Sequence, residues 1–196
     1  MNSDAALPTF GLEPGISIAQ AQPQARSAVR LESPALEVMT DLTLVKAAAT
    51  HPSTRLPQAE QMMINQGVRM LFVVSDMPAL EGLITTTDLG GDLAMALVAE
   101  RRLRHDELSV ADVMTPLSML DAIDLEQMRK ACVGNTVATL KRFGRNHLLV
   151  VQVASAQTPL RVRGVISRAQ IERQLGVALD IAPIASSFSE IERALV

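Results

Sequence analysis

The stretch LEGLITTTDL at residues 80–89 decides the fold. Gly82-Leu83-Ile84 is a short apolar run that predicts a buried strand, and the polar residues Thr85 to Asp88 are typical of a helix start. The next apolar residues recur with the helical period and predict one buried helical face, formed by Leu89, Leu93, Ala96 and Leu97. The stretch therefore predicts a strand that leads directly into a helix.

The junction at Thr85 has two possible roles. A helix N-terminus carries partial positive charge and free N–H groups, which suit an anion. The Thr85 hydroxyl can donate or accept a hydrogen bond, and the Asp88 carboxylate can accept from both hydroxyls of a ribose. The same two residues also fit an ordinary helix cap, which is the commoner reason for Thr and Asp at this position. Both interpretations stay open for this stretch alone.

The pattern occurs a second time in the same chain. Gly164-Val165-Ile166-Ser167 repeats Gly82 to Thr85, and Gln170 stands where Asp88 stands. Upstream, VMTDLT at residues 38–43 returns as VMTPLS at 113–118, and GVRMLFVV at 67–74 pairs with GRNHLLVV at 144–151. Three matches in the same order indicate one supersecondary unit, of type β-α-β-β-α, that is used twice.

This order of motifs resembles a pair of CBS domains, often called a Bateman module, and the resemblance covers about residues 33–176. It implies an α/β (α+β) fold in which two β-α-β-β-α repeats are related by a pseudo-twofold axis, with two clefts between their sheets. We expect a mobile N-terminal tail at residues 1–32 and a first CBS repeat with its linker at 33–109. A second repeat at 110–178 and a C-terminal amphipathic helix at 179–196 complete the expected organisation.

Local signals predict the elements of each repeat. In the first repeat we expect a strand at 45–50, a helix at 56–66 that Gly67 ends, and an antiparallel pair of strands at 69–74 and 80–85. In the second we expect a short helix at 124–131, a helix at 136–143 capped by Asn135, strands at 147–153 and 160–166, and a helix at 168–175.

Composition excludes several classes of function. The net charge of −3, the absence of Trp and Tyr and the presence of only four Phe residues argue against a nucleic-acid-binding surface. No apolar run approaches the roughly 20 residues that span a bilayer, and no signal-peptide core is visible at the N-terminus. We therefore expect a cytoplasmic protein with neither a nucleic-acid nor a membrane partner.

The sequence offers little for catalysis or for metal binding. The candidate nucleophile and bases, Cys132, His51, His105 and His147, stand in no recognisable catalytic or metal-binding spacing. Cys132 lies in an apolar setting where an inert thiol is the commoner outcome. We expect a protein that is not an enzyme, holds no metal and needs no obligatory cofactor.

The resemblance implies a regulatory module that binds an adenosine-containing ligand such as AMP, ADP, ATP, S-adenosylmethionine or a dinucleotide. Matched residue by residue, it implies a first ligand-binding cleft formed by Thr85, Asp88, Arg69 and Thr115. It implies a second cleft formed by Ser167, Gln170, His147 and Thr40. Because the amide of Gln170 offers one neutral acceptor where a carboxylate offers two charged ones, we expect the second cleft to hold a ribose less well or to stay empty.

Two functions remain possible at this stage. The first is a sensor that binds an adenine nucleotide and signals through its assembly or through contact with an unidentified protein partner. The second is a structural module that binds no small molecule and acts through dimerisation. We expect a homodimer in both cases, since closed twofold dimers are the commonest oligomers.

Overall fold

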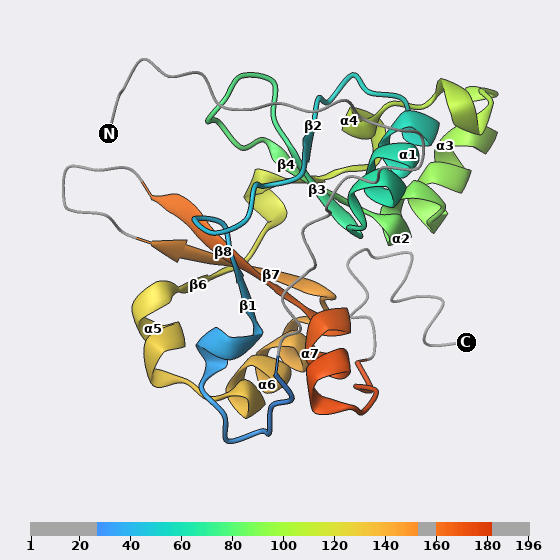
Figure 1. Ribbon diagram of the computed structural model, residues 1–196. Helices are drawn as coiled ribbons and strands as arrows, with labels where there is room; N and C mark the ends of the chain where they lie inside the picture. The colour runs from blue at the N-terminus through green and yellow to red at the C-terminus, as the bar shows by residue number, and fades with distance from the viewer. Residues whose placement is uncertain (1–26, 153–159, 182–196) are drawn as a thin grey trace, which may run out of the picture.

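The computed structural model describes residues 27–152 and 160–181 of the 196-residue chain. These residues form two layered units, each with a four-stranded sheet on its inner side and helices on its outer side (Figure 1). The strand order is β1-β8-β7-β6 in one sheet and β2-β3-β4-β5 in the other. The expected α+β fold class, with two copies of one unit, is confirmed.

The elements have the following bounds in chain order. The strands are β1 (Met39–Asp41), β2 (Ala49–Thr50), β3 (Met70–Val73), β4 (Gly82–Thr85), β5 (Thr115–Pro116), β6 (Ala122–Asp124), β7 (His147–Gln152) and β8 (Arg161–Ser167). The α-helices are α1 (Leu56–Gln66), α2 (Thr86–Leu89), α3 (Asp92–Arg101), α4 (Val110–Val113), α5 (Leu125–Lys130), α6 (Val133–Phe143) and α7 (Arg168–Leu175). Short 3-10 helices are η1 (Ala35–Val38), η2 (His105–Glu107) and η3 (Leu117–Met119).

The two repeats exchange their first strands. β1 precedes the first repeat in sequence but pairs antiparallel with β8 of the second, with Met39 opposite Ile166. β5 precedes the second repeat but pairs antiparallel with β4 of the first, with Leu83 opposite Thr115. Each sheet therefore contains an edge strand from the other half of the sequence.

Two glycines permit this exchange because the edge strand passes directly over them. A Cβ atom on Gly82 would lie 2.4 Å from the backbone oxygen of Thr115. A Cβ atom on Gly164 would lie 2.6 Å from the sulfur of Met39 and 2.9 Å from the backbone oxygen of Thr40. The glycine that begins each G-h-h-T/S motif is thus required by close packing of the backbone.

Three apolar cores hold the layers together. One core packs η1 against α5, α6, α7 and the inner strands β7 and β8. A second packs α1, α2 and α3 against β3, β4 and α4. The third lies between the two sheets, where Met70, Phe72 and Leu83 of one sheet meet Leu149 and Val165 of the other. This third core fixes how the two units sit on each other, and the clefts lie at its margins.

The predicted boundaries between the repeats differ from the packed units. Leu108, Val110 and Val113 are buried in the core of the first unit, although the boundary was expected at residues 109 and 110. Val29, in the expected tail, is buried in the core of the second unit, and its N–H donates to the Gln174 carbonyl oxygen at 3.0 Å. The tail boundary expected at residue 32 therefore lies too late, since residues 27–32 belong to the folded unit.

Most predicted elements are confirmed, and three differ. The single helix predicted after Thr85 is two helices, α2 and α3, because Gly91 starts α3 anew and a Cβ there would lie 2.8 Å from the Thr87 carbonyl oxygen. As a result Leu93 is exposed and Ala94 takes the buried position. The helix expected from residue 136 begins one turn earlier, at Val133, with Cys132 at its N-terminus.

The strand expected at 45–50 is only two residues long, since residues 42–45 form a turn and residues 46–48 have no regular secondary structure. The backbone N–H groups of Leu44 and Val45 both donate to the Asp41 carbonyl oxygen, which keeps this segment in turns. Of the expected C-terminal helix, residues 182–196 lie outside the described residues, and residues 179–181 are not helical. Within the described ranges, none of the helices is both long enough and apolar enough to cross a membrane.

Candidate functional site

Two cavities lie at the margins of the core between the sheets, and they are related as the repeats are related. The large cleft has a volume of about 760 Å³ and is lined from β1, β3, β8, α7 and the turns at residues 42–48. The small cleft has a volume of about 150 Å³ and is lined from β4, α2, β5 and the start of β7. Each cleft is formed by residues of both repeats.

The structure groups most of the predicted site residues as expected. Thr40, Ser167 and Gln170 line the large cleft, which is the second cleft of the sequence analysis. Thr85, Asp88 and Thr115 line the small cleft, which is the first. His147 stands at the boundary and lines both cavities.

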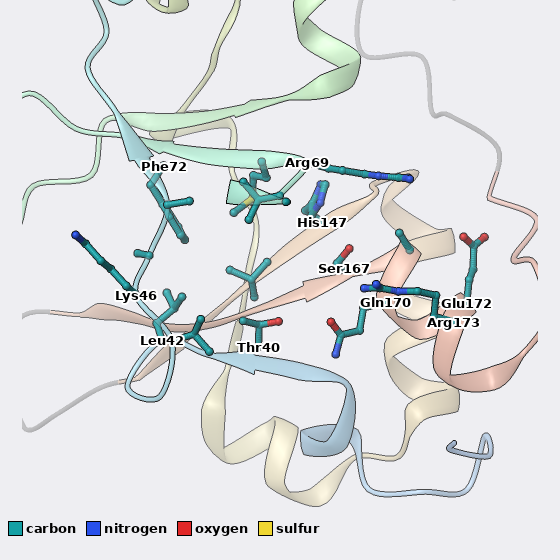
Figure 2. A pocket seen from close by; sticks show the side chains of 18 of the residues that line it. Thr40, Leu42, Lys46, Arg69, Phe72, His147, Ser167, Gln170, Glu172 and Arg173 are labelled. Carbon is teal, nitrogen blue, oxygen red and sulfur yellow. The ribbon is translucent and has the colours of Figure 1, made fainter. Parts of the chain in front are cut away.

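Arg69 is a correction, because it lines the large cleft and not the cleft of Thr85 and Asp88. Its backbone carbonyl does accept from the N–H of Thr86 at 3.0 Å, so the peptide group stays beside the helix of its own repeat. The side chain, however, crosses to the opposite unit and reaches toward α7 (Figure 2). Adjacency in the sequence does not reveal this crossing, because it depends on how the two sheets face each other.

The large cleft has a mostly apolar side, which carries one lysine, Lys46, and an opposite side that carries two arginines (Figure 2). Leu42 and Phe72 lie on this mostly apolar side, Val165 of the core between the sheets also lines the cleft, and Phe72 is almost fully buried. Arg69, which directly precedes β3, and Arg173 from α7 approach the opposite side. The hydroxyl groups of Thr40 and Ser167 lie between these two sides. The arrangement suits a ligand with a flat apolar group at one end, hydroxyls in the middle and negative charge at the other end.

Three of these lining residues were missed by the sequence analysis. Lys46 lies at the apolar side of the large cleft, within an alanine-rich segment that was interpreted as a strand. Phe72 was expected only as part of the strand at 69–74. Arg173 stands three residues after Gln170, on the same face of α7. That spacing is the signal that could have identified Arg173.

A clamp between the two repeats holds the wall of the large cleft that residues 42–48 form. Asp41 accepts hydrogen bonds from the N–H and the hydroxyl of Thr43 at 2.8 and 2.7 Å, and from Arg163 of β8 at 2.8–2.9 Å. Burial works to raise the pKa of the Asp41 carboxyl, but the bonds from Thr43 and the charge of Arg163 outweigh it and lower the pKa. The carboxylate therefore stays ionised and fixes the turn.

Glu172 fixes the opposite wall, where α7 ends. Its Oε1 accepts from Arg168 Nε and from the backbone N–H of Leu179, each at 2.8 Å. Burial works to raise the pKa of Glu172, but the hydrogen bonds from Leu179 and Arg168 and the charges of Arg168 and Arg69 lower it. Val177 and Ala178, in the segment that this carboxylate anchors, complete the rim of the cleft.

His147 lies between the clefts in a partly buried position at the start of β7. Burial and the positive charge of Arg69 lower its pKa to about 4. The imidazole is therefore neutral at pH 7 and can donate or accept a hydrogen bond without adding charge to either cleft.

Asp88 of the small cleft is used as a helix cap. Its Oδ2 accepts from both the backbone N–H and the hydroxyl of Thr85, each at 2.7 Å. Burial raises the pKa of this carboxyl, although the bonds from Thr85 and the charge of Arg145 act in the opposite direction. Both bonds end on one oxygen, so a ribose would have to use the other, Oδ1.

At the matching position of the large cleft, Gln170 lies on α7 without such a cap. The Ser167 side chain makes no capping bond to α7, and Gln170 Nε2 donates to Gln174 Oε1 at 3.1 Å. Gln174 is buried and donates in turn to the carbonyl oxygens of Ser27 and Glu37, each at 3.2 Å. Gln170 is thus held by a polar chain that leads toward the core of the second unit.

The described part of the chain contains no cluster of three or more His, Cys, Asp or Glu side chains that could hold a metal ion. The clefts therefore offer shape, hydroxyl groups and positive charge, which are the properties of a binding site for an anionic organic molecule.

Comparison with known proteins gives the fold. No protein-family model matches the sequence, and no curated protein matches it. Among solved structures, an uncharacterized conserved protein from Pyrococcus horikoshii is 19% identical with a TM-score of 0.54, and the match covers 79% of this chain and 100% of that one. The CBS domain of a bacterial CNNM/CorC family Mg²⁺ transporter is 17% identical with a TM-score of 0.51, over 76% of this chain and 81% of that one.

A third similar structure is a protein from Methanocaldococcus jannaschii proposed as an archaeal homolog of g-AMPK. It is 16% identical with a TM-score of 0.51, and the match covers 71% of this chain and 49% of that one. These likenesses agree with the duplicated motifs and with the two four-stranded sheets of this chain. The chain has the fold of a tandem CBS-domain protein.

Proposed function

We propose, starting from this tandem CBS fold, that the protein is a regulatory sensor that binds an adenosine-containing nucleotide in the large cleft. The observation that carries the proposal is a cavity of about 760 Å³ with an apolar side, two hydroxyl groups and two arginines on its opposite side. Sites that bind small molecules have volumes of about 300–1,000 Å³ and few, well-placed polar groups. The large cleft meets both conditions.

The proposed ligand lies along the cleft with its base against Phe72 and Leu42. The hydroxyls of Thr40 and Ser167 are then available to the ribose, and Arg69 and Arg173 to the phosphates. Guanidinium groups suit this role because their planar N–H groups match phosphate oxygens. Gln170 lies in the first turn of α7, three residues after Ser167. It offers the ribose a neutral amide, where the sequence analysis considered a carboxylate the better partner.

The small cleft is a weaker candidate for the same ligand. Its volume of about 150 Å³ lies below the range for a drug-sized molecule. A ribose bound to Thr85, Asp88 and Thr115 stays a prediction, and it requires this cleft to widen. The large cleft is favoured because it has the necessary volume before any ligand enters.

Regulation is proposed because the ligand would contact both units at once. Arg69 and Phe72 belong to one unit, and Ser167 and Arg173 belong to the opposite unit. A ligand that binds this arrangement better than any other shifts the population toward it. The change would leave the protein through its assembly as a homodimer or through contact with a protein partner.

The test is calorimetric titration of AMP, ADP and ATP into the full chain and two matched variants. Arg69→Gln removes a guanidinium from the large cleft, and Arg145→Gln removes one from the small cleft. Because a hydrogen-bonded ion pair contributes roughly 1.5–3 kcal/mol, Arg69→Gln should weaken binding about tenfold or more. Arg145→Gln should leave the affinity unchanged. Equal weakening by both variants, or no binding to the parent chain, would overturn the proposal.

A second candidate function is a dimerisation module that binds no small molecule. It is favoured by the exposed apolar side chains of α3, where Leu93 and Met95 are more than half exposed. Apolar side chains at such a position suit an interface between copies of the chain. Light scattering should give a molar mass of twice the 21.1 kDa of one chain, and the variant Leu93→Glu should have the molar mass of a single chain. A dimer whose stability no nucleotide alters would favour this candidate over the sensor.

A further inference from the structure

We propose that Glu172 is a specificity-determining residue of the large cleft, and that its fixed carboxylate limits the negative charge which the cleft accepts in a ligand. The inference rests on the proposed nucleotide binding and adds to it which nucleotides the cleft prefers. It concerns a residue that the sequence analysis did not single out.

The carboxylate of Glu172 cannot easily leave the cleft. Its Oε1 is held at 2.8 Å by both Arg168 Nε and the N–H of Leu179, and Arg168 Nη2 also donates to the Leu179 carbonyl oxygen. Leu179 is itself buried in the core of the second unit, so the group that holds the carboxylate is anchored. A ligand therefore meets Glu172 at a fixed place on the wall.

Glu172 faces the cationic side of the cleft. Its carboxylate points up from α7 toward the end of the Arg69 side chain, and Arg173 extends from the neighbouring position into the cleft (Figure 2). The charge of Arg69 is one of the causes that keep the pKa of Glu172 low, which places the two groups within electrostatic reach of each other. The ligand phosphates thus enter a field formed by Arg69, Arg173, the Glu172 carboxylate and Arg168, its ion-pair partner at 2.8 Å.

This field has a consequence for selectivity. A first phosphate can lie between the arginines, but each further negative charge is also repelled by Glu172. The repulsion grows in proportion to the charge of the ligand. Water and salt screen it in part, because Glu172 is partly exposed to solvent. A cleft with this carboxylate should therefore discriminate less in favour of ATP over AMP than the two arginines alone would.

The test compares adenosine, AMP, ADP and ATP by calorimetry at low salt and without divalent cations. Glu172→Gln removes the charge and keeps an oxygen that can accept from Leu179. Its affinity should be unchanged for adenosine, about threefold higher for AMP and about tenfold higher for ATP. Glu126→Gln is the matched control, because Glu126 makes a similar helical ion pair with Arg129 at 3.2 Å on α5, away from the cleft. It should change none of the four affinities.

A second variant protects the test from a structural effect of Glu172→Gln. Ala178→Glu adds a carboxylate to the exposed rim of the same wall without touching the bonds of Glu172. It should change the affinities in the opposite direction, with the largest loss of affinity for ATP and none for adenosine. Changes that are equal for all four ligands, or absent from both variants, would overturn the role of Glu172 while leaving the binding site in place. Failure of the proposed function is distinct, because then no ligand binds to any of the chains.

Discussion

The two clefts arise from one repeated unit, yet the large cleft has about 760 Å³ and the small cleft about 150 Å³. The difference begins at one position of the exchanged edge strands, where Asp41 ends β1 and Pro116 ends β5. Asp41 organises a turn, and seven residues, 42–48, then pass around the rim before β2. After Pro116 only five residues, 117–121, reach β6, and Leu120 and Asp121 line the small cleft.

A second difference lies at the helix starts beside the clefts. In the small cleft Asp88 caps α2 through Thr85, and Arg145 is the nearby cation. In the large cleft Ser167 makes no such cap, and two arginines face the cavity. A duplicated unit can thus keep its backbone while its two copies use the polar residues at the same positions differently.

The largest expected effect concerns His147, which both clefts share. The pKa of His147 is lowered to about 4 in the folded chain. Between about pH 6.5 and pH 4, His147 therefore binds a proton in the unfolded chain and not in the folded chain. Stability should therefore fall by about 3 kcal/mol as the pH falls through this window, relative to His147→Gln. Urea unfolding at several pH values measures the loss.

The same experiment distinguishes the two clefts by the arginine that acts on His147. Arg69 of the large cleft contributes to the low pKa of His147, so Arg69→Gln should make the loss smaller. Arg145→Gln in the small cleft should leave it unchanged. A pH profile of the parent chain that matched His147→Gln would contradict the burial of a neutral imidazole.

The next effect concerns the glycines beneath the exchanged strands. Gly82→Ala, behind the small cleft, places a Cβ atom against a backbone oxygen that cannot move, and should cost about 3 kcal/mol of stability. Gly164→Ala, behind the large cleft, first meets the flexible side chain of Met39 and should cost about 2 kcal/mol. Chemical denaturation measures the stability loss of both variants. A larger loss for Gly164→Ala would show that β1 packs more closely on its glycine than β5 does.

The Asp41 clamp should affect the large cleft alone. Asp41→Ala removes the bonds to Thr43 and Arg163 and should lower stability by about 1–2 kcal/mol. It should also weaken nucleotide binding several-fold, since the wall at residues 42–48 loses its fixed position. Pro116→Ala is the control at the matching place. If calorimetry gave equal affinities for both variants, the turn after Asp41 would have no role in nucleotide binding.

The smallest expected effect distinguishes two capping boxes of the same kind. Ser109 donates to Asp112 through its N–H and hydroxyl, as Thr85 does to Asp88. Hydrogen bonds from Ser109 lower the pKa of Asp112, whereas burial raises that of Asp88. Asp112→Asn should therefore lose stability at neutral pH, by up to about 1 kcal/mol, and lose less as the pH falls.

Asp88→Asn should show the opposite trend. It removes a buried charge, so it should become more favourable, relative to the parent, as the pH rises through the pKa of Asp88. Thermal unfolding of both variants between acid and neutral pH checks the two trends. Parallel pH profiles would indicate that the carboxylates of the two boxes have similar surroundings.

The fold could be predicted from the sequence because its signals are local and occur twice. Helix α1 matches its expected bounds, since Gly67 adopts φ +63° at its end, and α7 ends at Gly176 in the same way. The break between α2 and α3 was missed, because a pair of glycines inside an apolar period does not by itself show where a helix restarts.

The site could be predicted only in part. The resemblance to CBS domain pairs implied that Thr40 lies with Ser167 and Thr115 with Thr85, and each pair lines one cleft. The place of Arg69 could not be predicted, because its side chain crosses between units that are distant in sequence. The difference in cleft volume could not be predicted either, since it depends on how the turn after Asp41 is held by Arg163.

The most direct test of the large cleft as the nucleotide site uses tryptophan as a local reporter. The chain contains no Trp and no Tyr, so a single introduced Trp is the only strong source of fluorescence. Ala178→Trp places it at the rim of the large cleft, and Asp121→Trp at the small cleft, both at exposed positions. ATP should change the fluorescence of Ala178→Trp in a saturable way and leave that of Asp121→Trp unchanged. A saturable change in Asp121→Trp alone would contradict the account.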